Sequence, residues 1–159
     1  MCIVRLFRLL ILATIVSAGV AANAADLKVE ATLVWGSNSS NSVNHKALDA
    51  KRSKDLGRIF KWKQYYEITN CVATVAANAT VSLHMSPQCE LKVKNLDSSH
   101  VEVSWYGGGK LLMTQTKHAL PLTLAGPDKN DSAYFMLLRA VDGHAAAEKV
   151  YRVAVMPVH

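Results

Sequence analysis

Residues 89–105, CELKVKNLDSSHVEVSW, contain two consecutive runs in which apolar side chains occupy every second position. The apolar positions are Cys89, Leu91, Val93, Val101, Val103 and Trp105. A period of two is typical of a β-strand that buries one face. Asp97-Ser98-Ser99 lies between the runs and has the composition of a turn. The stretch therefore predicts two strands joined by a turn.

The same alternation recurs along most of the chain. Further strands are expected over Leu27–Trp35, with one buried face, and over Trp62–Val75, Val81–Met85, Lys110–His118, Leu120–Leu124, Tyr134–Leu138 and Val150–Val155. Strands that follow one another about every ten residues indicate a sandwich or a barrel. The run at Tyr134–Leu138 is apolar on both faces, which is typical of a central strand.

One segment, His45–Phe60, favours a helix, with Asn44 as its expected N-cap. A single short helix cannot cover both faces of a large sheet, so two packed β layers are expected. The sequence predicts a mainly β protein: a two-layer antiparallel β-sandwich of about eight strands with one short N-terminal helix. The expected core residues are Trp35, Leu91, Val93, Val101, Val103, Trp105, Met136, Leu138 and Val153.

The first 24 residues have the features of a secretory signal peptide. Arg5 and Arg8 precede the apolar run Leu9–Val16, and Ala22-Asn23-Ala24 supplies the small residues of a cleavage site. The apolar stretch is shorter than the roughly 20 residues of a membrane helix. We therefore expect cleavage after residue 24, a single sandwich domain over residues 25–159, and a periplasmic or secreted location.

Loss of the two arginines with the signal lowers the formal net charge from +6 to +4. A mild positive charge favours anionic partners such as acidic polymers or lipid headgroups. Export makes nucleic acid a poor candidate, and none is expected as a partner.

Cys71 and Cys89 are the two cysteines that follow the predicted signal. An even number in an oxidising compartment predicts one disulfide. The expected hairpin register opposes this pairing unless the chain changes sheets at Ser86-Pro87-Gln88 or the turn near Ala77-Asn78 shifts, because disulfides need Cα atoms within about 7 Å.

The densest group of charges lies in residues 46–63, where seven cations are opposed only by Asp49 and Asp55. Aromatic residues follow at once, so the segment indicates a surface that holds anionic polymers or membranes. The alternative is a solvated helix whose neighbouring aromatic side chains enter the core. The candidate ligand-binding residues are Lys51, Lys54, Arg58, Trp62, Lys63 and Tyr65.

The sequence gives little support to a metal site or a catalytic site. The histidines lack the spacing of a zinc site, and His84 and Met85 should face opposite sides of a strand, which opposes a shared copper ion. No Gly-x-Ser-x-Gly motif occurs, although a triad assembled from distant residues stays open. No catalytic residue, metal or cofactor is therefore expected.

The segment Phe60-Lys61-Trp62-Lys63-Gln64-Tyr65-Tyr66-Glu67, together with Val34-Trp35-Gly36 and Ala133-Tyr134-Phe135, resembles a group of small exported bacterial proteins of unassigned function. The resemblance implies an envelope or secreted location and no particular activity. The sequence as a whole predicts an exported, non-enzymatic binding or envelope-associated module. Two alternatives stay open: a structural subunit of an envelope protein assembly, bound through a sheet edge, and a hydrolase whose site has no sequence motif.

Overall fold

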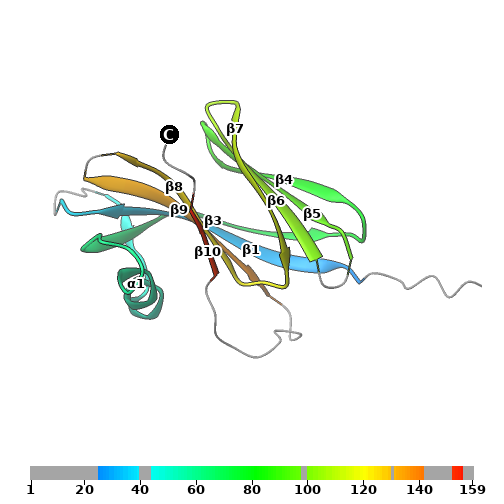
Figure 1. Cartoon of the computed structure of the whole chain (residues 1–159), viewed down its shortest axis with the longest axis horizontal. Helices are drawn as coiled ribbons and strands as arrows, with labels where there is room; N and C mark the ends of the chain where they lie inside the picture. Colours follow the sequence, from blue (N-terminus) through cyan, green and yellow to red (C-terminus); the bar gives the residue numbers. More distant parts are fainter. Residues whose placement is uncertain (1–24, 40–43, 98–99, 130, 142–151, 156–159) are drawn as a thin grey trace, which may run out of the picture.

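Two β-sheets pack face to face as a sandwich, and one short helix lies on the outer side of the larger sheet (Figure 1). The computed structural model describes residues 25–39, 44–97, 100–129, 131–141 and 152–155, and only the backbone of residues 129 and 152–155. The predicted signal peptide lies outside the described residues. The predicted mainly β sandwich is confirmed.

The larger sheet has six strands in the order β10-β8-β9-β1-β3-β2. Their bounds are β1 Leu27–Ser37, β2 Lys46–Ala47, β3 Gln64–Val75, β8 Leu122–Lys129, β9 Ser132–Ala140 and β10 Arg152–Val155. Neighbouring strands are antiparallel, except that β10 runs parallel to β8. The chain crosses to the smaller sheet at Ala76–Ala79, where the backbone turns with Asn78 at a positive φ of 58°.

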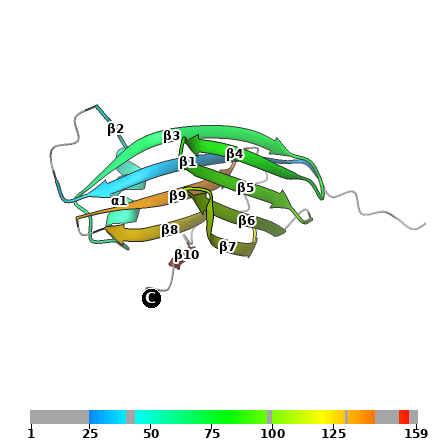
Figure 2. The same cartoon turned by 90° about the horizontal axis from the view of Figure 1, so that it is seen from above.

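The smaller sheet has four strands in the order β4-β5-β6-β7. Their bounds are β4 Thr80–Ser86, β5 Cys89–Asn95, β6 His100–Gly107 and β7 Lys110–His118. This sheet covers only one half of the larger sheet, while α1 (Ala50–Gly57) lies beneath the other half (Figure 2). The two halves of the larger sheet are therefore covered from opposite sides.

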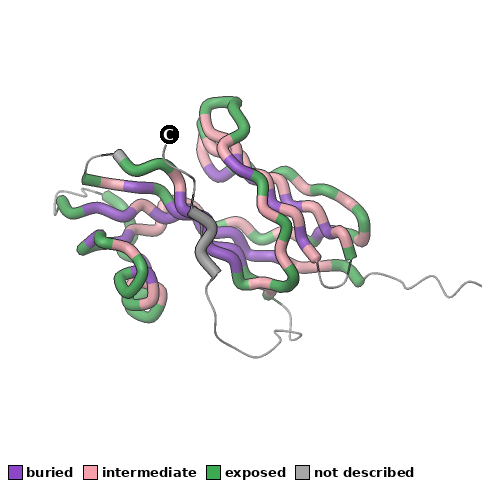
Figure 3. Tube along the Cα trace, in the orientation of Figure 1, coloured by how far each residue is buried: buried purple, intermediate pink, exposed green. Residues whose placement is uncertain are grey.

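The main core fills the space between the two sheets, where buried residues of the middle strands face one another (Figure 3). Seven of the predicted core residues are buried there: Leu91, Val93, Val101, Val103, Trp105, Met136 and Leu138. Trp35 is only half-buried and belongs to neither core cluster, so its placement in the core was wrong. The side chain of Val153 lies outside the described residues.

A second core lies between α1 and the opposite face of the larger sheet. It contains Val34, Leu48, Leu56, Trp62, Tyr65, Ala125, Ala133, Phe135 and Leu137. The prediction that Leu27–Trp35 buries only one face was therefore wrong. Glu30, Thr32 and Val34 on the second face are 7%, 1% and 0% exposed.

The helix is shorter than predicted. The segment His45–Phe60 yields α1 over Ala50–Gly57 only, preceded by the short edge strand β2. Asp49, not Asn44, is the N-cap, because its carboxylate accepts a hydrogen bond from the backbone amide of Arg52 at 3.0 Å. In the described part of the chain no helix has the length and hydropathy needed to cross a membrane.

The predicted disulfide is not present, since Cys71 and Cys89 are both free thiols. The chain changes sheets at Ala76–Ala79 and not at Ser86-Pro87-Gln88, which forms the turn between β4 and β5. The two cysteines thus belong to different sheets, Cys71 to β3 and Cys89 to β5. Burial raises the pKa of the Cys89 thiol, while a 3.1 Å hydrogen bond from the Trp105 indole partly offsets that effect.

Candidate functional site

Two of the three cationic residues of α1, Lys51 and Lys54, and its C-cap Arg58 lie on the side of the helix that faces solvent, whereas Arg52 bonds to Thr32 of β1. Leu56 is buried against the larger sheet, and residues three or four positions apart share one side of a helix. Lys51, Lys54 and Arg58 are all exposed and lie on the side opposite Leu56. The helix therefore presents a short basic stripe to solvent.

Acidic neighbours divide the seven cations of residues 46–63 into two groups. Four of them have an acidic partner: Lys46 with Glu67, Arg52 with Asp49 and Glu67, Arg58 with Asp55, and Lys61 with Asp128. In the part of the chain that the structure describes, Lys51, Lys54 and Lys63 have none. These three side chains are the cations best able to meet an external anion.

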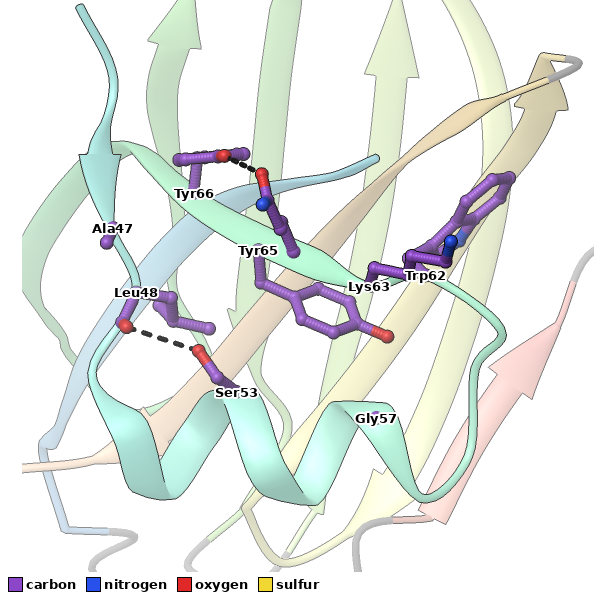
Figure 4. A pocket seen from close by; sticks show the side chains of 9 residues that line it. Ala47, Leu48, Ser53, Gly57, Trp62, Lys63, Tyr65 and Tyr66 are labelled. Atoms are coloured by element: carbon purple, nitrogen blue, oxygen red, sulfur yellow. Dashed lines mark hydrogen bonds between the residues drawn. The ribbon is translucent and has the colours of Figure 1, made fainter. Parts of the chain in front are cut away.

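The two aromatic candidates lie beneath the helix and not beside the basic stripe. Trp62 and Tyr65 are 4% and 5% exposed and pack in the second core. Figure 4 shows the Tyr65 ring directed from β3 toward α1, whereas Tyr66 points to the opposite face of the sheet. The predicted basic and aromatic residues thus share one region but do not form one continuous surface.

An open recess of about 380 Å³ lies where α1 meets the start of β3. Its lining comprises Ala47, Leu48, Ser53, Gly57, Trp62, Lys63, Gln64, Tyr65 and Tyr66 (Figure 4). Lys63 supplies the only charge in this lining, which contains no Asp, Glu, His or Cys. Burial raises the pKa of Tyr65 to about 12, so its phenol stays protonated at neutral pH. The recess offers one cation and hydrogen-bonding groups, without a carboxylate or imidazole for acid–base chemistry.

A polar cluster anchors the helix end of the larger sheet and was not predicted. Glu30 accepts hydrogen bonds from Asn70 at 2.6 Å and from Arg139. Thr32 accepts from Asn70 at 3.0 Å and from Arg52 of α1 at 3.2 Å. Because each buried polar group here has partners, we assign the cluster a structural role: it ties α1 and three strands together.

The Glu30 carboxylate should make stability depend on pH. Burial alone would raise its pKa, but hydrogen bonds from Asn70 and Arg139 and the positive charges of Arg139 and Arg52 lower it below 4.5 overall. A lowered folded-state pKa contributes stability that is present above the unfolded value and is lost as the pH falls through the folded value. We therefore expect the free energy of unfolding to decrease as the pH is lowered below about 4.5.

Denaturant titrations of the wild type and Glu30→Gln between pH 7 and pH 3 test this expectation. The variant should be less stable at pH 7 and should lose less stability over the same pH range, with Asp49 supplying part of the remaining slope because its pKa is also lowered. Parallel pH profiles in the two proteins would contradict the assignment.

The structure bears on two other kinds of site, a metal site and a sheet edge that could bind another protein. His84 is exposed while Met85 of the same strand is 1% exposed, so the two side chains face opposite sides of β4. Among the described residues, no three His, Cys, Asp or Glu side chains are grouped as a metal centre would require.

The nine-residue β7 lies at an edge of the smaller sheet and carries Leu111, which is 55% exposed.

Comparison of the chain with protein-family models, with curated proteins and with solved structures finds no match.

Proposed function

We propose that this chain is a non-enzymatic module that binds an anionic polymer through Lys51, Lys54 and Lys63. The observation that carries the proposal is the division of the cations: these three are exposed and lack an acidic partner among the described residues. Arg58, the third member of the basic stripe, shares its charge with Asp55 at 3.5 Å. If residues 1–24 direct export, as the sequence predicts, the polymer would belong to the cell envelope or its surroundings.

A polymer fits this surface better than a membrane does. Helices that lie on membranes insert a broad apolar face between the lipids. The apolar side of α1 is instead turned toward the larger sheet, and Trp62 and Tyr65 are buried with it. Ile59, 46% exposed, is the one exposed large apolar residue that the structure describes near the stripe. Charge contacts without apolar insertion are the interaction that this surface can make.

Binding to dextran sulfate tests the proposal, with uncharged dextran as the control. The Debye length falls from about 10 Å at 0.1 M salt to about 3 Å at 1 M, so retention at 0.1 M should be largely lost at 1 M. Uncharged dextran should not retain the protein through these lysines. Vesicles that contain anionic lipid test the membrane alternative. Equal retention at both salt concentrations, or vesicle binding that survives 1 M salt, would contradict the proposal.

A second candidate function rests on β7. The nine residues of β7 pair on one side only among the described strands, and an edge of this length is enough to accept a strand from another protein by backbone pairing. Lys110 and Lys117 oppose this function, because lysines on edge strands discourage such pairing. The two functions separate in a pull-down from a cell envelope: a protein partner that is retained at 1 M salt would favour the edge strand.

A further inference from the structure

Three aromatic residues form a row across neighbouring strands at the helix end of the larger sheet. Trp35 of β1 lies directly opposite Tyr66 of β3 and directly opposite Tyr134 of β9. Directly paired residues project from the same face of a sheet. The ring centroids of Trp35 and Tyr66 are 5.7 Å apart, and the imidazole of His45 contacts Trp35 at the same centroid distance. We call Tyr66, Trp35 and Tyr134 the aromatic row.

The aromatic row lies on the face that the smaller sheet covers elsewhere. Leu33 lies two residues before Trp35 on β1, and Met136 lies two residues after Tyr134 on β9. Both point into the main core, and residues two positions apart on a strand project from the same face, so the aromatic row shares that face. The smaller sheet covers the other half of this face (Figure 1). Tyr134 is 44% exposed, and Trp35 and Tyr66 are half-buried without joining either core cluster. These rings are therefore partly accessible.

A row of uncharged polar residues runs beside the aromatic row on the same face. Ser37 of β1 lies opposite Gln64 of β3 and Ser132 of β9. Gln64 is exposed and accepts a hydrogen bond from the Tyr66 hydroxyl, and Ser37 is buried, where it accepts one from the Ser39 amide at 3.0 Å. The six positions of the two rows include no charged side chain.

A pyranose sugar matches this arrangement. Its ring has an apolar face of C–H groups, which can stack on the electron-rich face of an aromatic ring, and a rim of hydroxyl groups that form hydrogen bonds. In β-1,4-linked glucose or N-acetylglucosamine the ring substituents are equatorial, so the ring faces are flat. A protein partner would instead need pockets for its own anchoring side chains and a charged or polar rim.

We propose that the aromatic row is a carbohydrate-binding site for β-1,4-linked pyranose chains that carry no net charge. It lies on the face opposite α1 and does not depend on the lysines of the proposed polyanion site. Tyr134 and Trp35 stack on sugar rings, and Gln64 and the Tyr66 hydroxyl form hydrogen bonds with the hydroxyl groups of the sugar.

Titration with cellohexaose and with N-acetylchitohexaose tests the site, with tryptophan fluorescence and calorimetry as readouts. Trp35 is half-buried, whereas Trp62 and Trp105 are buried, so a saturable change in emission is expected from Trp35 with at least one of the two sugars. Tyr134→Ser should raise the Kd about tenfold through the loss of one stacked ring. Tyr134→Phe keeps the ring and should bind nearly as well as the wild type.

Two controls separate this site from the polyanion site. Sugar affinity should be unchanged at 1 M salt and in a variant that replaces Lys51, Lys54 and Lys63, because the oligosaccharides carry no net charge. Tyr106→Ser, which changes a tyrosine on the smaller sheet, should bind like the wild type. The proposal is overturned if neither sugar gives saturable binding, or if Tyr134→Ser binds as tightly as the wild type.

Discussion

Replacing Trp105 with alanine should lower the free energy of unfolding by about 3–5 kcal/mol, the usual cost of removing a large aromatic side chain from a core. The indole is 3% exposed and packs in the main core between the two sheets. Its outer edge lies so close to Gly126 of β8 that a Cβ there would be 2.9 Å from the ring. Loss of the ring therefore leaves a cavity at the contact between the sheets.

Denaturant unfolding measures this loss directly, since the midpoint and slope give the free energy in water. Trp35→Ala is the matched control: the same substitution at a half-buried tryptophan outside both core clusters should cost clearly less. If the two variants lose the same stability, or if Trp105→Ala loses less than about 1 kcal/mol, Trp105 does not fill the main core.

The alternating patterns predicted the fold well because they describe burial directly. In β5 and β6 each apolar position of the quoted stretch faces the main core or its margin, and Gly108 and Gly109, both at positive φ, form the turn to β7. Local composition also predicted that Tyr134–Leu138 is a central strand, and β9 does lie inside the larger sheet, with β8 and β1 as its neighbours. These features are determined by residues that lie close together in the sequence, so a single sequence is enough to predict them.

Features that depend on distant residues were missed. Glu30 and Thr32 look solvent-facing in an alternating strand, yet α1 and the partners of Glu30 on β3 and β9 enclose them. A buried carboxylate of this kind is stable only with its partners, and no local pattern says that Asn70 and Arg139 are near. The disulfide was predicted wrongly for the same reason, because whether Cys71 and Cys89 can meet depends on where the chain changes sheets.

The candidate site was predicted in part. The density of lysine and arginine in residues 46–63 is visible in the sequence, and most of these side chains are exposed. Which cations have acidic partners depends on the fold: Lys61, for example, meets Asp128 from a strand 67 residues away. The aromatic row was also invisible, since Tyr66, Trp35 and Tyr134 come together only through strand pairing.

The largest effect on binding should come from replacing Lys51, Lys54 and Lys63 together with glutamine. Each cation near an anionic surface contributes about 1 kcal/mol, and 1.4 kcal/mol corresponds to a tenfold change in affinity. The triple variant should therefore raise the Kd for dextran sulfate on the order of 100-fold. Its stability should change little, because these exposed charges have no acidic partner in the described part of the chain.

A matched variant removes the same amount of charge elsewhere. Lys94, Lys110 and Lys117 lie on β5 and β7 of the smaller sheet, and no ion pair joins them to described residues. Replacing these three with glutamine lowers the net charge equally but leaves α1 and β3 intact. At 0.15 M salt the Debye length is about 8 Å, so distant charges should contribute little to a local contact.

The Kd for dextran sulfate in these two triple variants, measured side by side at 0.15 M salt, tests the central claim most directly. A polyanion site at α1 and the start of β3 predicts a loss on the order of 100-fold for the Lys51, Lys54 and Lys63 variant. The Lys94, Lys110 and Lys117 variant should stay within about threefold of the wild type, as screening of distant charges requires. Equal losses in the two variants would contradict the claim, because they would mean that binding follows net charge and not a site.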